Sequence, residues 1–210
     1  MAIGILAAFW AVSFLLVISP GMDWAYTISA GMRGRMVLPA VFGLLVGYLI
    51  ITVIIAVGIG AFVSQNKIVM TIISALGTVY LLWLGINMLL HPSVPQIGKE
   101  QDFDSWSRWA IVGVGVSGLN PKGFLLFFAL LPQFTDPAAS WPIPVQIMAL
   151  GIVHVLSCGV IYLLVGYCSK AVLQTRPCAA RIVNRFSGAS MTAIALLLAA
   201  EQAMRLHINN

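Results

Sequence analysis

The sequence predicts an all-α polytopic membrane protein. Hydrophobic residues make up 60% of the 210-residue chain, whereas charged residues make up only 8%. Because a soluble domain is about a quarter charged, lipid is the expected solvent. Six apolar stretches approach or exceed the roughly 20 residues that a helix needs to cross a bilayer. We expect these spans at residues 3–29, 37–63, 68–90, 109–131, 145–169 and 186–204.

The first span is expected to be a broken helix. Ser19, Pro20 and Gly21 interrupt the apolar run, and Asp23 follows them. Proline removes a backbone donor and clashes with the preceding turn, so the helix opens there. The N-terminus has no basic region and no small-residue cleavage site before the apolar run, which favours a retained span over a cleaved signal peptide. A five-span alternative, in which this segment only dips into the membrane, remains open.

The fourth span carries a matching interruption. Asn120, Pro121, Lys122 and Gly123 again place a proline and a charge inside an apolar run. Counted from the same membrane face, both prolines lie roughly 16–18 Å deep at the rise of an α-helix, near the middle of a bilayer about 30 Å thick. Interrupted spans in corresponding positions of two halves are typical of transporter binding sites.

These breaks predict one transporter domain over residues 1–210, built as an inverted repeat. Its halves are about residues 1–91 and 109–206, joined by a polar cytoplasmic loop at 92–108. The second span contains Gly43 and Gly47 in a G-x-x-x-G pattern, which favours close helix packing within the chain or a homodimer face. The sixth span is expected to follow a loop at residues 170–185.

Basic residues indicate the orientation. The loops after the first, third and fifth spans carry eight lysines and arginines, while the opposite side carries only Lys67 and Arg205. Since such residues concentrate on the cytoplasmic side, these three loops are predicted to be cytoplasmic and both termini periplasmic, in a bacterial inner membrane. The eight residues are Arg33, Arg35, Lys99, Arg108, Lys170, Arg176, Arg181 and Arg185. No dense basic run is present, which argues against nucleic-acid binding.

The sequence contains no convincing cofactor-binding or catalytic motif. The cysteines at 158, 168 and 178 form no C-x-x-C pair, so we interpret them as packing residues and not as metal ligands. A G-x-G-x-x-G match at 113–118 lies inside an apolar span without a preceding strand. Zinc-protease, nucleotide-binding and hydrolase signatures are missing from the chain. We therefore expect no enzyme, no metal and no cofactor.

Asp23 and Lys122 are the charges that need an explanation. Each costs at least about 2.5–3.5 kcal/mol near the centre of a span unless it has a partner or a wet cavity. They either form an ion pair that fixes two helices, or bind a zwitterion or relay a proton. The helix ends at Pro20–Gly21 and Pro121–Gly123 add N–H groups suited to a carboxylate and carbonyls suited to an ammonium group.

Further polar and aromatic residues are candidates for the same site. Asn120 either caps the opened backbone or contacts a ligand. Trp24, Tyr48 and Phe127 are candidate pocket residues, although each aromatic also suits lipid or helix packing. His154 in the fifth span is a lone intramembrane histidine, either a proton relay or a structural residue.

Taken together and in order, these motifs resemble those of the LysE/RhtB family of amino-acid exporters. The family's P-G-P-D motif is similar to residues 20–23, although Met22 replaces its second proline. Its N-P-K motif, phenylalanine-rich run and P-Q-F are similar to residues 120–134, and its third-span pattern to residues 77–85. In the second span Tyr48 follows Gly47, where the family usually has an acidic or polar residue.

The resemblance implies export of an amino acid or related zwitterion from the bacterial cytoplasm, coupled to the proton gradient. The expected partners are a small-molecule substrate and the lipid bilayer. Two alternatives stay open. One is an exporter of another small solute or a cation, and the other is a non-transporting membrane module that acts with a partner protein.

Overall fold

The computed structural model describes residues 3–63, 67–92, 105–120, 123, 127–128, 130–169 and 177–208. These residues are helical apart from short turns and connections, and no strand occurs among them. The predicted all-α polytopic membrane fold is confirmed.

The first span is bent where the sequence predicts a break. Helix α1 covers Ile3–Val17 and α2 covers Met22–Met32, and the two axes differ by 59°. Gly21 stands before α2 in an extended conformation (φ −163°, ψ −160°). Pro20 lies buried inside the break. Proline thus ends the α1 geometry, and α2 starts in a new direction.

The first helix of the fourth span also ends where the sequence predicts a break. Helix α5 covers Trp106–Gly118 and ends two residues before Asn120. Pro121 and Lys122 lie outside the described residues. Helical residues occur again at Gly123 and Phe127, and a 3₁₀ turn, η1, covers Leu131–Phe134.

The remaining helices follow the predicted spans, with one correction. Helices α3 (Val37–Val63), α4 (Lys67–Leu90) and α7 (Ile143–Tyr167) begin and end within about two residues of their expected bounds. Helix α9 covers Pro177–Ile208, so it starts nine residues before the predicted sixth span. The placement of Pro177 in a loop was wrong, because proline is favoured in the first turn of a helix, where its missing N–H is not needed.

Three described segments are long and apolar enough to cross a membrane by themselves: Val37–Gly58, Ile143–Tyr167 and Arg181–Met204. The bent α1–α2 pair passes the same test when taken together, as a broken span or a re-entrant segment. The apolar segment Ala75–Leu90 of α4 is shorter. The chain is therefore an integral, multi-pass membrane protein.

Small residues bring α3 against α5. A methyl group added at Gly43 would lie 2.1 Å from the Ala110 carbonyl oxygen, and one at Gly47 would lie 2.0 Å from Ser117 Oγ. Such close approach is typical of small-residue packing in membranes. The G-x-x-x-G pattern therefore packs α3 against α5 within the chain and is not available as a dimer interface. A homodimer stays a prediction that this motif does not support.

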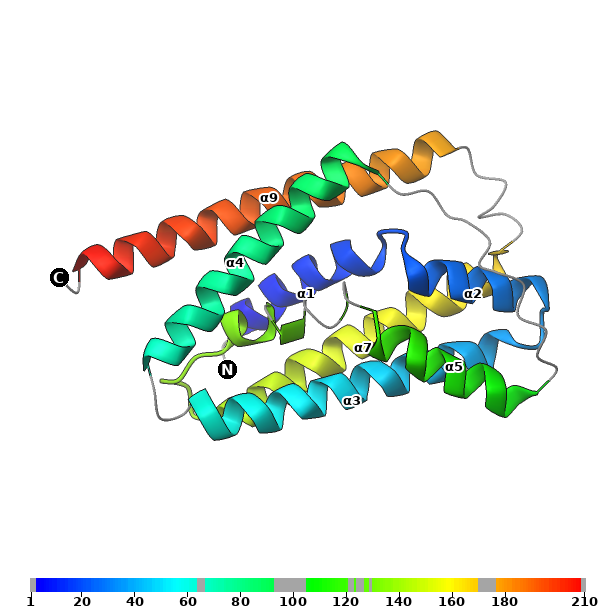
Figure 1. Cartoon of the computed structure of the whole chain (residues 1–210), viewed down its shortest axis with the longest axis horizontal. Coiled ribbons are helices and arrows are strands. Elements are labelled where there is room, and N and C mark those ends of the chain that lie inside the picture. Colours follow the sequence, from blue (N-terminus) through cyan, green and yellow to red (C-terminus); the bar gives the residue numbers. More distant parts are fainter. Residues whose placement is uncertain are drawn as a thin grey trace.

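Helices α4 and α9 form a pair beside the central helices (Figure 1). Gly85 and Gly188 face each other across this pair, where an added methyl group at Gly188 would lie 2.8 Å from the Gly85 carbonyl oxygen. The pair touches the central helices through η1, α1 and α3. The central helices α1, α2, α3, α5 and α7 surround the first break.

Candidate functional site

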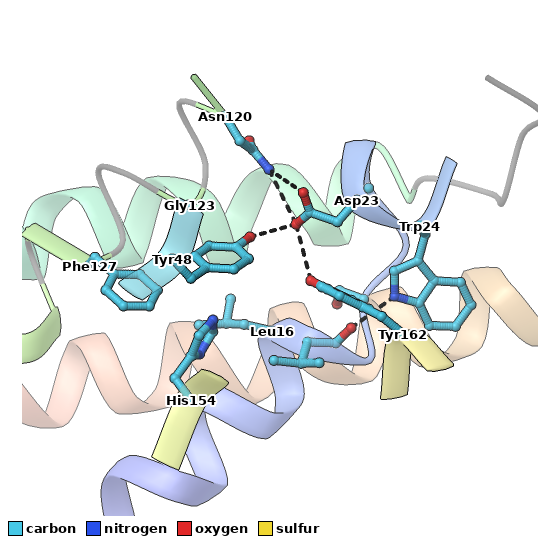
Figure 2. A pocket seen from close by; sticks show the side chains of 12 residues that line it. Leu16, Asp23, Trp24, Tyr48, Asn120, Gly123, Phe127, His154 and Tyr162 are labelled. Atoms are coloured by element: carbon cyan, nitrogen blue, oxygen red, sulfur yellow. Dashed lines mark hydrogen bonds between the residues drawn. The ribbon is translucent and has the colours of Figure 1, made fainter. Parts of the chain in front are cut away.

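A small pocket lies at the break between α1 and α2 (Figure 2). Its walls come from α1, the break, α2, α3, α7 and the fourth span, so both halves of the chain contribute. The cavity volume is about 30 Å³, which is room for about two water molecules. In this conformation the pocket holds less than an amino acid.

Asp23 is the acidic centre of this pocket. It lies in the first turn of α2 and is only 7% exposed. The hydroxyls of Tyr48 and Tyr162 donate to its Oδ2 at 2.6 and 3.1 Å, and Asn120 Nδ2 lies 3.5 Å from both carboxylate oxygens. Figure 2 shows these three donors converging on the carboxylate. They replace the water that a carboxylate loses inside a membrane.

Trp24 stabilises the break next to Asp23. Its indole Nε1 donates to the Val17 carbonyl at 2.9 Å. The last carbonyls of a helix have no intrahelical partner, and in lipid each such group needs one. Trp24 lines the pocket and at the same time ties the end of α1 to the start of α2.

The fourth span orients Tyr48. A methyl group at Gly123 would lie 3.1 Å from Tyr48 Cε1, so the glycine lets the chain approach the ring. The Phe127 ring stacks on Tyr48 with centroids 5.4 Å apart and planes 17° apart. The tyrosine hydroxyl is held toward Asp23 by this packing.

His154 lies at the base of the pocket, between α7 and α1. Its Nδ1 is 2.7 Å from Ser13 Oγ, and its Nε2 is 3.2 Å from Cys158 Sγ. The imidazole meets the Tyr48 and Phe127 rings edge to face, at 5.1 and 4.6 Å between centroids. Both ring nitrogens are engaged, which is the arrangement of a histidine that connects two helices.

The structure thus gathers most of the predicted site residues at one place. Asp23, Gly21, Trp24, Tyr48, Asn120, Gly123, Phe127 and His154 all line the pocket, and Pro20 lies between two lining residues. The predicted site residues Pro121 and Lys122 fall outside the described residues, so both interpretations of Asp23 and Lys122, an ion pair or a ligand and proton site, stay predictions. No group of three or more His, Cys, Asp or Glu within the described ranges could hold a metal ion.

Sequence reasoning missed Tyr162, Ser13 and Ser19. Tyr162 had a usable signal, because positions 154, 158 and 162 are four residues apart and share one face of a helix. Ser13 had none, since a single serine in an apolar run is unremarkable. Ser19 was treated only as part of the motif around Pro20.

Comparison with known proteins places these features in a family. The family model described as LysE type translocator matches residues 14–202. An uncharacterized membrane protein of Vibrio cholerae is 29% identical over 97% of this chain and 100% of its own length.

Two relatives carry functional names. The homoserine/homoserine lactone efflux protein of Salmonella typhi is 30% identical, covering 71% of this chain and 72% of its own length. The cysteine/O-acetylserine efflux protein of Salmonella choleraesuis is 23% identical, covering 69% and 74%. No solved structure matches.

Proposed function

The chain belongs to the LysE type translocator family, and we propose that it exports an amino acid or a closely related zwitterion across the bacterial inner membrane. The observation that carries this proposal is the buried Asp23 carboxylate at a helix break, in a pocket lined by both halves. A carboxylate held by hydroxyl and amide donors attracts an ammonium group. The two Salmonella relatives are named homoserine/homoserine lactone and cysteine/O-acetylserine efflux proteins, which agrees with an amino acid or a close derivative as the substrate.

We propose that the two halves form an inverted repeat, with α1–α2 corresponding to the fourth span, α3 to α7 and α4 to α9. Helix packing supports this. At the level of whole spans, exchanging the halves converts the packing of α3 on the fourth span into that of α7 on the first, and the contact of α4 with the fourth span into that of α9 with the first. The α3–α7 and α4–α9 pairs map onto themselves.

Transport would then use the pocket between these halves. Its volume of about 30 Å³ is too small for an amino acid, so binding requires the halves to move apart on one side of the membrane. Alternating access by rocking of one repeat against the other provides that opening. Proton coupling, with Asp23 as the proton-accepting group and Lys122 as its neighbour in the second break, completes the proposal. The termini would face the periplasm.

The test is efflux from cells that overproduce the protein and are preloaded with labelled amino acids and dipeptides, with and without a protonophore. We expect selective, protonophore-sensitive loss of one or a few amino acids. Asp23→Asn and Lys122→Ala should each abolish this loss while the amount of protein in the membrane holds.

A matched control is Asp136→Asn, in the connection between η1 and α7. Its carboxylate accepts a local hydrogen bond from the Ala138 N–H at 2.8 Å, and an amide oxygen can accept the same bond. This variant should export normally.

Two outcomes of the efflux test would overturn the proposal. Selective loss of a cation would favour the cation exporter, and no flux from purified protein in liposomes would favour the non-transporting module.

A further inference from the structure

Ser19 is the feature that the proposed site leaves unexplained. Its side chain is 3% exposed and lines the pocket, yet its Oγ has no hydrogen-bond partner among the described residues. A buried hydroxyl without a partner is costly, especially in lipid. The Ser19 hydroxyl is therefore available to a molecule that enters the pocket.

The neighbouring backbone groups do not satisfy this hydroxyl. Ser19 N–H donates to the Leu16 carbonyl at 3.2 Å, and the Val17 carbonyl already accepts the indole N–H of Trp24. Pro20 has no N–H to offer. The break thus uses its own polar groups in local contacts and leaves the Ser19 hydroxyl facing the pocket.

The start of α2 provides a second observation at the same place. Helix α2 is 11 residues long, and its N-cap residue is Gly21, which has no side chain to cap the first N–H groups. The first N–H groups of a helix have no intrahelical acceptor and form the positive end of its dipole. Such groups, together with a serine hydroxyl, are a suitable site for a carboxylate.

We propose that Ser19 and the first turn of α2 bind the α-carboxylate of the substrate, while Asp23 binds its ammonium group. This assignment rests on the proposed export of a zwitterion. Asp23 follows Gly21 by two residues, so the acidic and the donor-rich parts of the pocket are adjacent. An α-amino acid carries its ammonium and carboxylate groups on the same carbon, which suits this adjacency. A simple organic anion is repelled by Asp23 and is not expected to bind.

The substrate preference of Ser19 variants tests the assignment. Purified protein in liposomes takes up whichever labelled amino acid the efflux experiment selects, with homoserine tried first. The competitors are the unlabelled amino acid and its amino alcohol, in which a hydroxymethyl group replaces the carboxylate. The ratio of their inhibition constants reports carboxylate recognition and is insensitive to the amount of folded protein.

In the Ser19→Ala protein we expect the preference for the amino acid over the amino alcohol to fall about tenfold, as for the loss of a hydrogen bond to a charged group. The inhibition constant of the amino alcohol should change less than twofold. Ser19→Thr should keep the preference. An unchanged ratio, or an equal loss for both competitors, would overturn the assignment while leaving export itself intact.

Ser187→Ala is the matched control. Ser187 is also buried with an unpartnered Oγ among the described residues, but it lies on α9, away from the lining of the pocket. It should leave the ratio unchanged. If Ser19→Ala does not fold, Ser19→Cys keeps a similar size but replaces the hydroxyl with a much weaker donor, so the ratio should fall there as well, and an unchanged ratio overturns the assignment. If the wild-type protein exports no amino acid, the proposed function fails, and this inference fails with it.

Discussion

The central helices and the α4–α9 pair differ in what they bury. Around the first break, the Asp23 carboxylate accepts hydrogen bonds from two tyrosines, and a small pocket lies beside it. Between α4 and α9, Gly85 and Gly188 meet, and a neutral hydrogen bond runs from Gln202 Nε2 to Thr78 Oγ1 at 2.9 Å. Both regions pack through small residues, but a buried carboxylate is found at the break.

The buried carboxylate indicates a functional role for the break, whereas the glycine contacts of the α4–α9 pair indicate packing alone. Charged groups inside a membrane are expensive and are retained where they are used, whereas small-residue packing merely lets two helices approach. We therefore expect changes at the central site to lower transport more than stability. Changes in the α4–α9 pair should lower stability alone. Substitutions in both regions test this difference, beginning with the small-residue packing that both regions share.

Gly43→Ala should have the largest effect on folding. Its new methyl group would lie 2.1 Å from the backbone oxygen of Ala110, so two helices must separate, and overpacking of this kind costs about 3 kcal/mol. The measurement is the free energy of unfolding in detergent. Gly58→Ala on the same helix has nothing within 4 Å of the new methyl and should leave stability unchanged. Equal effects of the two would contradict the packing of α3 on α5.

Tyr48→Phe and Tyr162→Phe test the central site without altering its shape. Each removes one hydroxyl that donates to Asp23. A hydrogen bond to a charged group contributes about 1.5–3 kcal/mol, so transport should fall by about tenfold or more. The 2.6 Å bond of Tyr48 should matter more than the 3.1 Å bond of Tyr162. Tyr80→Phe on α4, in the α4–α9 pair, is the matched control. A comparable loss of transport in this variant would contradict the difference between the central site and the α4–α9 pair.

Ser13→Ala separates the two interpretations of His154. The serine hydroxyl lies 2.7 Å from His154 Nδ1, and its loss should lower the free energy of unfolding by about 1 kcal/mol. If His154 only connects α1 and α7, export by the folded variant stays sensitive to a protonophore. Export that persists but no longer responds to the protonophore would instead make His154 a proton relay.

Gln202→Leu should have the smallest effect. Hydrogen bonds between membrane helices average about 0.6 kcal/mol, and the Gln202–Thr78 bond joins helices that already pack through glycines. We expect a loss of stability of this size in a thermal unfolding experiment, with normal transport. A marked loss of transport would show that the α4–α9 pair takes part in the transport cycle.

The positions of the helices follow closely from the sequence because lipid imposes a simple rule. Every backbone group in the membrane needs an internal partner, so long apolar runs become helices, and α3 and α7 lie where the runs predict. Proline and glycine mark the break at residues 18–21 for the same local reason. The start of α9 was misplaced because Pro177 suits either a loop or a first turn.

The contacts of the site follow less from the sequence. A helix that is apolar on all sides gives no periodic signal for which face meets which neighbour. Tyr162 approaches Asp23 across 139 positions of sequence, and Ser13 approaches His154 across 141. Nothing local to these residues specifies such pairs.

The sequence by itself determined a helical membrane protein with two interrupted spans and an acidic residue after the first interruption, because hydropathy and proline act locally. Tertiary structure alone decided that Tyr48, Tyr162 and Asn120 are the donors to Asp23. It also decided that Ser19 is left unpartnered against the pocket. The physical reason is that hydrogen bonding depends on which helix faces meet, and that is set by packing between residues far apart in the chain.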